Sequence, residues 1–153
     1  MPSRRHKAAR LFSGLLLGAI LALPLASAAQ TIGYIKTVQG AASVTRDGVT
    51  EAAVIGHPLR VGDTLLTARD GSLGLTLKDD TMMSLGPNSE LLLDSFLFEP
   101  AASELGLSAR LTSGTLQFVS GIISKLKPES VAIDTPTATI GVRGTRFLVK
   151  VKP

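Results

Sequence analysis

Apolar side chains that alternate with small or polar ones constrain the fold of this chain more than any other feature. A spacing of two places the apolar residues on one face of an extended strand, whereas a helix needs a spacing of three or four. Helical spacing is nearly absent after residue 30. We therefore expect half-buried β-strands in the alternating runs, which are Leu73, Leu75 and Leu77; Leu105, Leu107, Ala109 and Leu111; Leu116 and Phe118; Val131 and Ile133; Ala138, Ile140 and Val142; and Phe147, Val149 and Val151.

Turn residues separate these runs at short intervals. Asp-Gly pairs at 47–48 and 70–71 favour the positive φ angles of tight hairpin turns. Spaced turns of this kind predict an all-β fold of many short strands, arranged as a β-solenoid or roll or as a flattened sandwich. The remaining predicted turns are Val61-Gly62-Asp63, Gly86-Pro87-Asn88, Ser113-Gly114, Lys127-Pro128-Glu129, and Gly141 with Gly144.

Residues 1–28 have the pattern of a cleavable secretory signal peptide, which would form a helix ahead of a β domain at 29–153. Basic residues at 4, 5, 7 and 10 precede an apolar stretch at 11–25. That stretch is short for a membrane span, which needs about 20 apolar residues. Ala26-Ser27-Ala28 supplies the small residues of a cleavage site. An uncleaved anchor is the alternative, although no stop-transfer charges follow Ala29. We expect a periplasmic or secreted protein with no stable membrane anchor after cleavage.

The charge balance changes when the predicted signal is removed. Four of the 16 basic residues and none of the 12 acidic ones lie in that segment, which leaves 12 of each. A neutral mature chain argues against nucleic-acid partners, since these require a basic surface. The chain has no cysteine, so its core must form without disulfides.

Several glycine-containing motifs recur in an order that resembles a known family. They are GAASV at 40–44, VGDTLLT at 61–67, SLGPNS at 84–89 and TPTATIGVRGTRF at 135–147. This order is similar to the FecR-type domain, in the form of a short exported stand-alone member, and the resemblance extends from about Gly40 to Val149. The motif residues that it marks as structural are Gly62, Asp63, Thr135, Pro136, Gly141, Arg143, Gly144 and Thr145.

The resemblance implies an extracytoplasmic, mainly β domain. The namesake members are membrane-spanning regulators that relay a signal from an outer-membrane transporter to a cytoplasmic sigma factor. Here no cytoplasmic anti-sigma segment precedes the apolar stretch, and the sequence stops at Pro153 where relatives often continue. We therefore expect the family's location and fold, without direct control of a sigma factor.

The sequence argues against an enzyme and against a cofactor. A hydrolase needs a nucleophile and a base within hydrogen-bond distance, and the mature chain has no cysteine and only His57, before Pro58 at a turn. We expect a solvated loop histidine. Asp79 and Asp80 are adjacent, so on a strand they would point to opposite faces, and we expect a turn that leads into Thr81.

Asp63 could bind a metal, but a turn aspartate that bonds its own backbone is the ordinary interpretation, and we predict no metal. Arg143 has two interpretations. It could form a buried fork to Asp63 or Asp134, or it could bind an anionic ligand together with Arg146.

Basic residues gather near the end of the chain. They could contact an anionic surface, or they could block unwanted pairing of an edge strand. These residues are Lys125, Lys127, Arg146, Lys150 and Lys152.

These observations favour a non-catalytic extracytoplasmic interaction and signalling module. It would pair with another envelope protein, or with a second copy, through an edge strand or a loop. The alternative is a module that binds cell-wall glycan or peptide, which would need a groove with aromatic platforms or convergent polar groups.

Overall fold

The computed structural model describes residues 28–152, and this range is predominantly β-strand. The predicted all-β class is therefore confirmed. The predicted signal helix lies outside the described residues, as does Pro153. Within the described range, no helix is both long enough and apolar enough to span a bilayer.

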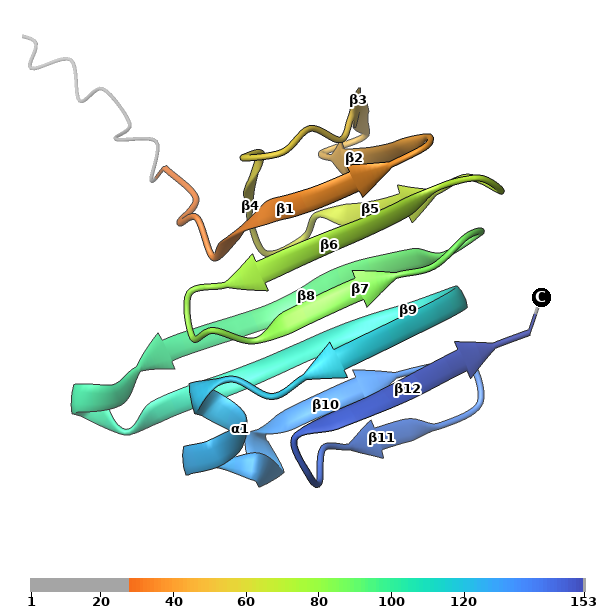
Figure 1. Ribbon diagram of the computed structural model, residues 1–153. Helices are drawn as coiled ribbons and strands as arrows, with labels where there is room; N and C mark the ends of the chain where they lie inside the picture. The colour runs from red at the N-terminus through yellow and green to blue at the C-terminus, as the bar shows by residue number, and fades with distance from the viewer. Residues whose placement is uncertain (1–27, 153) are drawn as a thin grey trace, which may run out of the picture.

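A single curled sheet of 12 strands forms the fold, and its two halves face each other as layers (Figure 1). The first layer has the order β4-β1-β6-β7-β9-β12 and the second β3-β2-β5-β8-β9-β10-β11. In the described range every pair is antiparallel except β9 with β10. The strands are β1 (Gly33–Gln39), β2 (Ala42–Arg46), β3 (Val49–Ala52), β4 (Pro58–Leu59), β5 (Thr64–Thr67), β6 (Ser72–Leu77), β7 (Met82–Leu85), β8 (Glu90–Glu99), β9 (Glu104–Val119), β10 (Val131–Asp134), β11 (Thr139–Gly141) and β12 (Arg146–Val151).

The core lies between the layers and follows the predicted alternation. In β6, Leu73, Leu75 and Leu77 are all buried, and in β9 every second residue is buried on each side of Gly114. Leucine dominates the fully buried side chains, and Phe118 is the largest of them. Burial of this apolar face is the main favourable term for a chain without disulfides.

The long strand β9 belongs to both layers. Its first part pairs with β8 and β10, and its last part, from Gly114, pairs with β7 and β12. Gly114 has φ +85°, and a Cβ there would lie 2.2 Å from Ser89 Oγ. The predicted turn at Ser113-Gly114 is therefore wrong: the glycine bends one continuous strand from one layer into the other.

Corners that connect the two layers stack along one side of the molecule (Figure 1). The Ala68 N–H donates to Ala41 O at 2.9 Å, and the Asn88 N–H donates to Ala68 O at 3.1 Å. The Asp70-Gly71 pair is part of this stack and joins β5 to β6 across the layers, so it is not the predicted hairpin turn. A Cβ at Gly71 would lie 2.2 Å from Ala41 O, and close packing therefore explains this glycine.

The Asp47-Gly48 hairpin prediction is confirmed. These two residues connect β2 to β3 with φ angles of +51° and +78°, as a two-residue turn with positive φ at both positions requires. Within residues 28–152, helical structure is limited to α1 (Ile122–Leu126) and the 3₁₀ segments η1 (Pro100–Ala102) and η2 (Pro128–Ser130). The predicted turn at 127–129 lies at η2.

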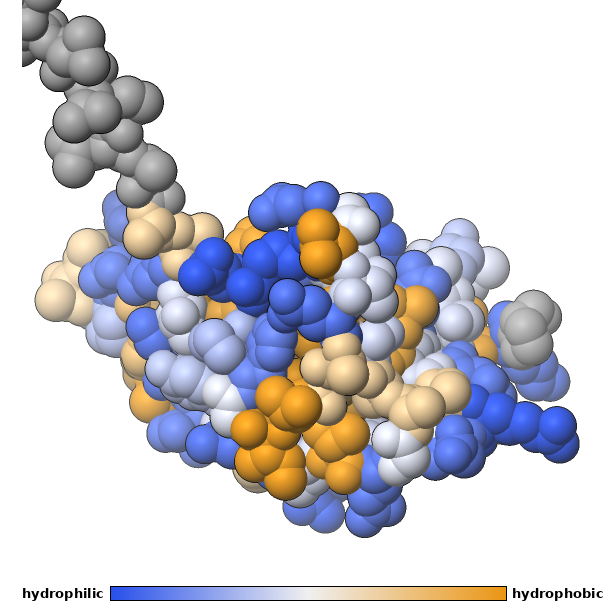
Figure 2. All heavy atoms as spheres, turned by 90° about the horizontal axis from the view of Figure 1, so that it is seen from above, coloured by the Kyte–Doolittle hydropathy of each residue, from blue (hydrophilic) through white to orange (hydrophobic). Residues whose placement is uncertain are grey.

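The two ends of the layered sheet differ. At one end, β3 and β4 are short, and the loop after β3 covers the core with the buried Ala53. Figure 2 shows the molecule from this side, where apolar side chains lie among hydrophilic ones. Val49, on β3, and Val54 and Ile55, in the loop after it, are exposed. At the other end lie β11 and β12 (Figure 1), and no loop of the described chain continues over them.

Candidate interaction edge

Two strands have an unpaired edge at the β11/β12 end, which we call the open end. Within residues 28–152, β12 pairs only with β9, and β11 pairs only with β10. A strand edge without a neighbour presents backbone N–H and C=O groups that can pair with another extended segment. The open end therefore offers main-chain hydrogen-bonding groups.

The side chains of β12 divide into two rows. Phe147, Val149 and Val151 face the core and are buried or half-buried, and Phe147 stacks on Phe118 with ring centroids 4.9 Å apart. The outer row is Arg146, Leu148 and Lys150, all exposed, with Leu148 at 67%. A large apolar side chain thus lies between two cations on the outer face.

The backbone hydrogen bond just before β12 shows which residues of β12 bond to β9 and which point away from it. The Ser120 N–H donates to Thr145 O at 2.9 Å, and the register then pairs Arg146 with Val119 and Phe147 with Phe118. Because hydrogen-bonded pairs alternate along an antiparallel ladder, Phe147, Val149 and Val151 bond to β9. The backbone groups of Arg146, Leu148 and Lys150 consequently point to the free edge.

A fixed turn joins β11 to β12. Val142 is buried, Gly144 has φ +99°, and the Ser120 hydroxyl donates to Gly144 O at 2.8 Å. No atom lies within 4 Å of a Cβ at Gly144, so its backbone angle is what favours glycine. The turn leaves Arg143 exposed beyond its buried neighbour Val142.

Grooves flank this turn on both sides. One, of about 620 Å³, lies against α1, η2 and β10, and the other, of about 470 Å³, lies between β11 and β12. Arg143 lines both grooves. The first groove is also lined by Ser124, whose buried hydroxyl has no hydrogen-bond partner among the described residues.

Thr135 and Pro136 lie at the other end of the β10–β11 hairpin. The Thr135 N–H donates to Ala138 O at 2.8 Å, and the Thr135 hydroxyl oxygen accepts from the Ala138 N–H at 3.1 Å. The Thr139 hydroxyl donates to Asp134 Oδ1 at 2.6 Å. These bonds close the hairpin, and Asp134 is engaged within it.

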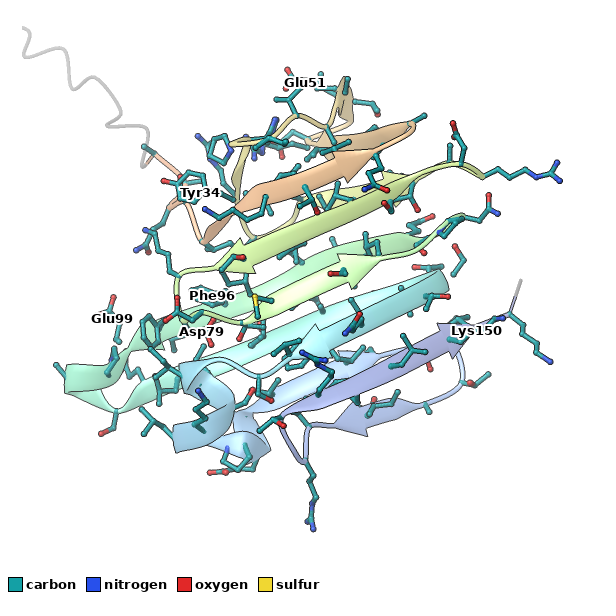
Figure 3. The ribbon with its side chains drawn as sticks, in the orientation of Figure 1. Tyr34, Glu51, Asp79, Phe96, Glu99 and Lys150 are labelled. Atoms are coloured by element: carbon teal, nitrogen blue, oxygen red, sulfur yellow. The ribbon has the colours of Figure 1, made fainter. Side chains whose placement is uncertain are left out.

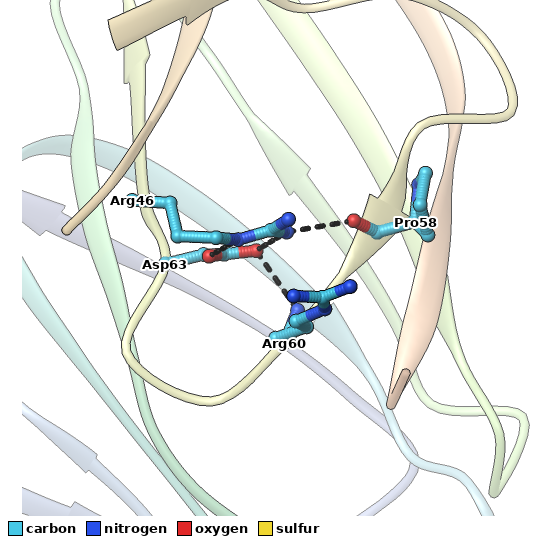
Figure 4. Close-up of polar contacts among 4 residues, drawn as sticks. All are labelled: Arg46, Pro58, Arg60 and Asp63. Atoms are coloured by element: carbon cyan, nitrogen blue, oxygen red, sulfur yellow. Dashed lines mark hydrogen bonds and ion pairs between the residues drawn. The ribbon is translucent and has the colours of Figure 1, made fainter. Parts of the chain in front are cut away.

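The buried fork that the sequence suggested for Arg143 is formed by Arg46 instead (Figure 4). Arg46 Nε and Nη2 donate to the two carboxylate oxygens of Asp63, both at 2.7 Å, and Nη2 also reaches Pro58 O at 2.9 Å. These hydrogen bonds raise the pKa of the Arg46 guanidinium above its ordinary value. Arg143, which is exposed, forms neither of the two suggested carboxylate pairs.

Asp63 also bonds its own turn. Its Oδ2 accepts from the Arg60 N–H at 2.8 Å, which confirms the interpretation as a turn aspartate. Gly62, with φ +91°, completes the turn. Gly62 and Asp63 therefore stabilise the β2–β5 region, and the remaining motif residues lie at the β10–β12 end.

Asp79 is a second buried carboxylate, and its bond to a distant helix could not be predicted from the sequence. It accepts from the Thr81 hydroxyl at 2.8 Å and from the Thr81 and Ile123 N–H groups, both at 3.2 Å (labelled in Figure 3). The predicted turn into Thr81 is present, with the exposed Asp80 at φ +64°. Asp79 thus fastens α1 to the β6–β7 hairpin.

His57 lies in the loop before β4 and is half-buried. Its N–H donates to Val54 O at 3.1 Å, and its carbonyl accepts from the Ile35 N–H at 3.1 Å. Its backbone therefore helps to hold the loop that covers the core.

A family model described as FecR protein matches residues 63–153. The chain belongs to the FecR protein family. This is a family with signalling and regulatory functions. The match begins at Asp63, so it includes the open end and leaves β1–β4 outside its range. Neither the search of curated proteins nor the search of solved structures gave a match.

Proposed function

We propose that this FecR-family chain is a non-catalytic extracytoplasmic module that binds another envelope protein by strand pairing at its open end. One observation carries the proposal: in the described part of the chain, β11 and β12 each have a free edge, with half-buried apolar side chains such as Ile140 and Phe147 between them. Strand addition to an exposed sheet edge is a common mode of protein recognition, since main-chain bonds supply affinity and side-chain rows supply specificity.

The β3/β4 end of the sheet is less suited to strand pairing than the open end. There β3 has four residues, and β4 has two, one of which is Pro58. Short edges and proline are ordinary devices against unwanted pairing. β12 has six residues and no proline, so it lacks these two devices, and the charges of Arg146 and Lys150 on its outer row oppose pairing with a strand of like charge only.

Site-specific photo-cross-linking in the producing cells tests the proposal. The full chain would carry a photoreactive amino acid at Leu148 on the open end, or at Val49 on the opposite end, which is similarly exposed at 61%. We expect one discrete adduct with an envelope protein from position 148 and none from position 49. Monomer alone from both positions would contradict the proposal.

A further inference from the structure

We propose that β12 selects an extended partner segment whose outward side chains follow the order acidic, apolar, acidic. This inference rests on the proposed function and specifies the strand and the chemistry of its partner.

Length and available backbone groups favour β12 over β11. β12 has six residues, and Arg146, Leu148 and Lys150 direct their backbone groups outward. β11 has only three residues, and its hairpin bonds leave only Thr139 and Gly141 outward within the strand. A segment added to β12 can therefore form the longer ladder.

The outer row of β12 sets the chemistry of the partner. Side chains directly opposite across a strand pair lie about 5 Å apart, and opposite charges there attract. Arg146, Leu148 and Lys150 thus match an acidic residue, an apolar residue and an acidic residue in turn. Arg143 and Lys152 add exposed positive charge beside the strand, and β11 and β12 contain no acidic residue (Lys150 is labelled in Figure 3).

The inner row adds a second requirement. Phe147, Val149 and Val151 line the core side of the edge, and a groove of about 470 Å³ extends between β11 and β12. The partner residues between the acidic and apolar ones should therefore be apolar, since they would lie on the same face of the sheet as Phe147, Val149 and Val151. The expected partner segment is acidic, apolar, apolar, apolar, acidic.

A second copy using the same strand fits poorly. Antiparallel pairing of two β12 strands about Leu148 would place Arg146 of each copy opposite Lys150 of the other. Like charges directly opposite each other are destabilising. The same cations that discourage self-pairing therefore attract an acidic strand.

Peptide binding to the folded domain of residues 29–153 tests the inference. The probe is a fluorescein-labelled peptide with the central sequence Glu-Val-Leu-Val-Glu, and its matched control has lysine in place of both glutamates. We expect fluorescence anisotropy to show binding of the glutamate peptide and about tenfold weaker binding of the lysine peptide. Circular dichroism would first establish that the isolated domain is folded.

Two variants of β12 locate the site. Leu148→Pro removes an outward N–H without removing a bond to β9, and we expect about tenfold weaker binding of the glutamate peptide. Leu148→Val keeps both that N–H and an apolar side chain in the outer row, and it should retain most of the binding. Equal binding by the proline variant and the unchanged domain would overturn the assignment to β12.

Charge reversal provides a test that does not depend on Leu148. Arg146→Glu with Lys150→Glu should make the lysine peptide the better ligand, whereas Arg69→Glu with Lys78→Glu, on exposed loop residues, should leave the preference unchanged. Failure to reverse the preference, or no binding of either peptide, would overturn the inference. The cross-link from position 148 would then decide separately whether the open end binds a protein of different chemistry.

Discussion

Buried carboxylates hold turns in this molecule through bonds to segments distant in the sequence. Asp63 bonds Arg46, 17 residues away, and Asp79 bonds the Ile123 N–H, 44 residues away. Both aspartates have essentially no exposed surface. A buried charge is tolerated when its hydrogen bonds are made and is costly when they are removed, so these two residues are sensitive points for stability.

Arg46→Met tests the first of these contacts. It would leave Asp63 buried without its charged partner, and we expect a loss of about 2 kcal/mol in the free energy of unfolding. Chemical denaturation measures the loss. Arg110→Met is the matched control, because Arg110 and Asp94 form an exposed ion pair at 3.4 Å, and its loss should cost under about 0.5 kcal/mol. Equal effects would contradict the structural role of Arg46.

The sign of the Arg46 pKa shift sets its pH dependence. Its pKa is raised in the folded state, so the protonated guanidinium favours folding. That contribution is fully present below the ordinary pKa of arginine and is lost only as pH rises through the still higher folded-state value. Titration of Arg46 therefore leaves stability unchanged across neutral pH.

Asp79→Asn tests the second contact. An amide NH₂ group facing the donors of Thr81 or Ile123 cannot replace the carboxylate oxygens, so we expect a loss of about 1–3 kcal/mol. Faster amide exchange in α1 would show that the helix is released. Asp80→Asn is the adjacent control, since Asp80 is exposed and asparagine tolerates its positive φ; its stability should change by less than about 0.5 kcal/mol. The same loss for both variants would contradict the assignment.

For single residues, the sequence predicts the turn at Asp63 but not which arginine bonds the Asp63 carboxylate. Arg46 and Arg143 are equal candidates when only residue type and spacing are known, and the choice depends on β2 lying beside β5. Leu148 can be recognised from the sequence more easily. It is apolar, whereas the alternation in β12 predicts a polar residue at its position. Such a break in the pattern marks a strand with apolar side chains on both faces.

At the scale of elements, glycine allows the chain to pass between the layers. Gly114→Ala would place a methyl group 2.2 Å from Ser89 Oγ at a φ of +85°. We expect a loss of more than about 3 kcal/mol, from steric overlap added to backbone strain. Gly48→Ala isolates the backbone term, because no atom lies within 4 Å of its Cβ at φ +78°, and should cost about 1 kcal/mol. Thermal denaturation would compare the two, and similar midpoints would contradict the packing argument.

Alternation predicts most of the strands but not how consecutive strands connect. The predicted strands at 105–111 and 116–118 are one strand, because both sides of Gly114 keep their ladders to neighbours. A spacing of two between apolar residues shows which face of a strand is buried. It does not show whether a glycine reverses the chain or bends it. The helix α1 is missed because five residues are too few to show a helical period, and its start depends on Asp79.

At the scale of the whole molecule, the signal-like residues 1–28 predict export from the cytoplasm. We expect the exported protein to begin after Ala28, because the A-x-A pattern at 26–28 follows a short apolar stretch. N-terminal sequencing of protein from the cell envelope fraction gives the answer. A chain that retains residues 11–25, or one found only in the cytosol, would contradict both the predicted cleavage and the proposed location.

Two exposed residues of opposite charge lie on the outermost strands of the two ends. Glu51 lies on β3, and Lys150 lies on β12 (Figure 3). A net charge summed over the chain hides this difference. The sequence reveals the basic cluster near residue 150, but only the sheet order shows that it borders an unpaired edge.

Because β9 belongs to both layers, the chain cannot be cut at its bend into two fragments that each contain a complete sheet. Cleavage between Ser113 and Gly114 would give each fragment half of a strand on which the other fragment's sheet depends. Neither 28–113 nor 114–152 should fold alone, and the two should regain β structure when mixed. A chain divided at the bend would thus become two fragments that fold only together.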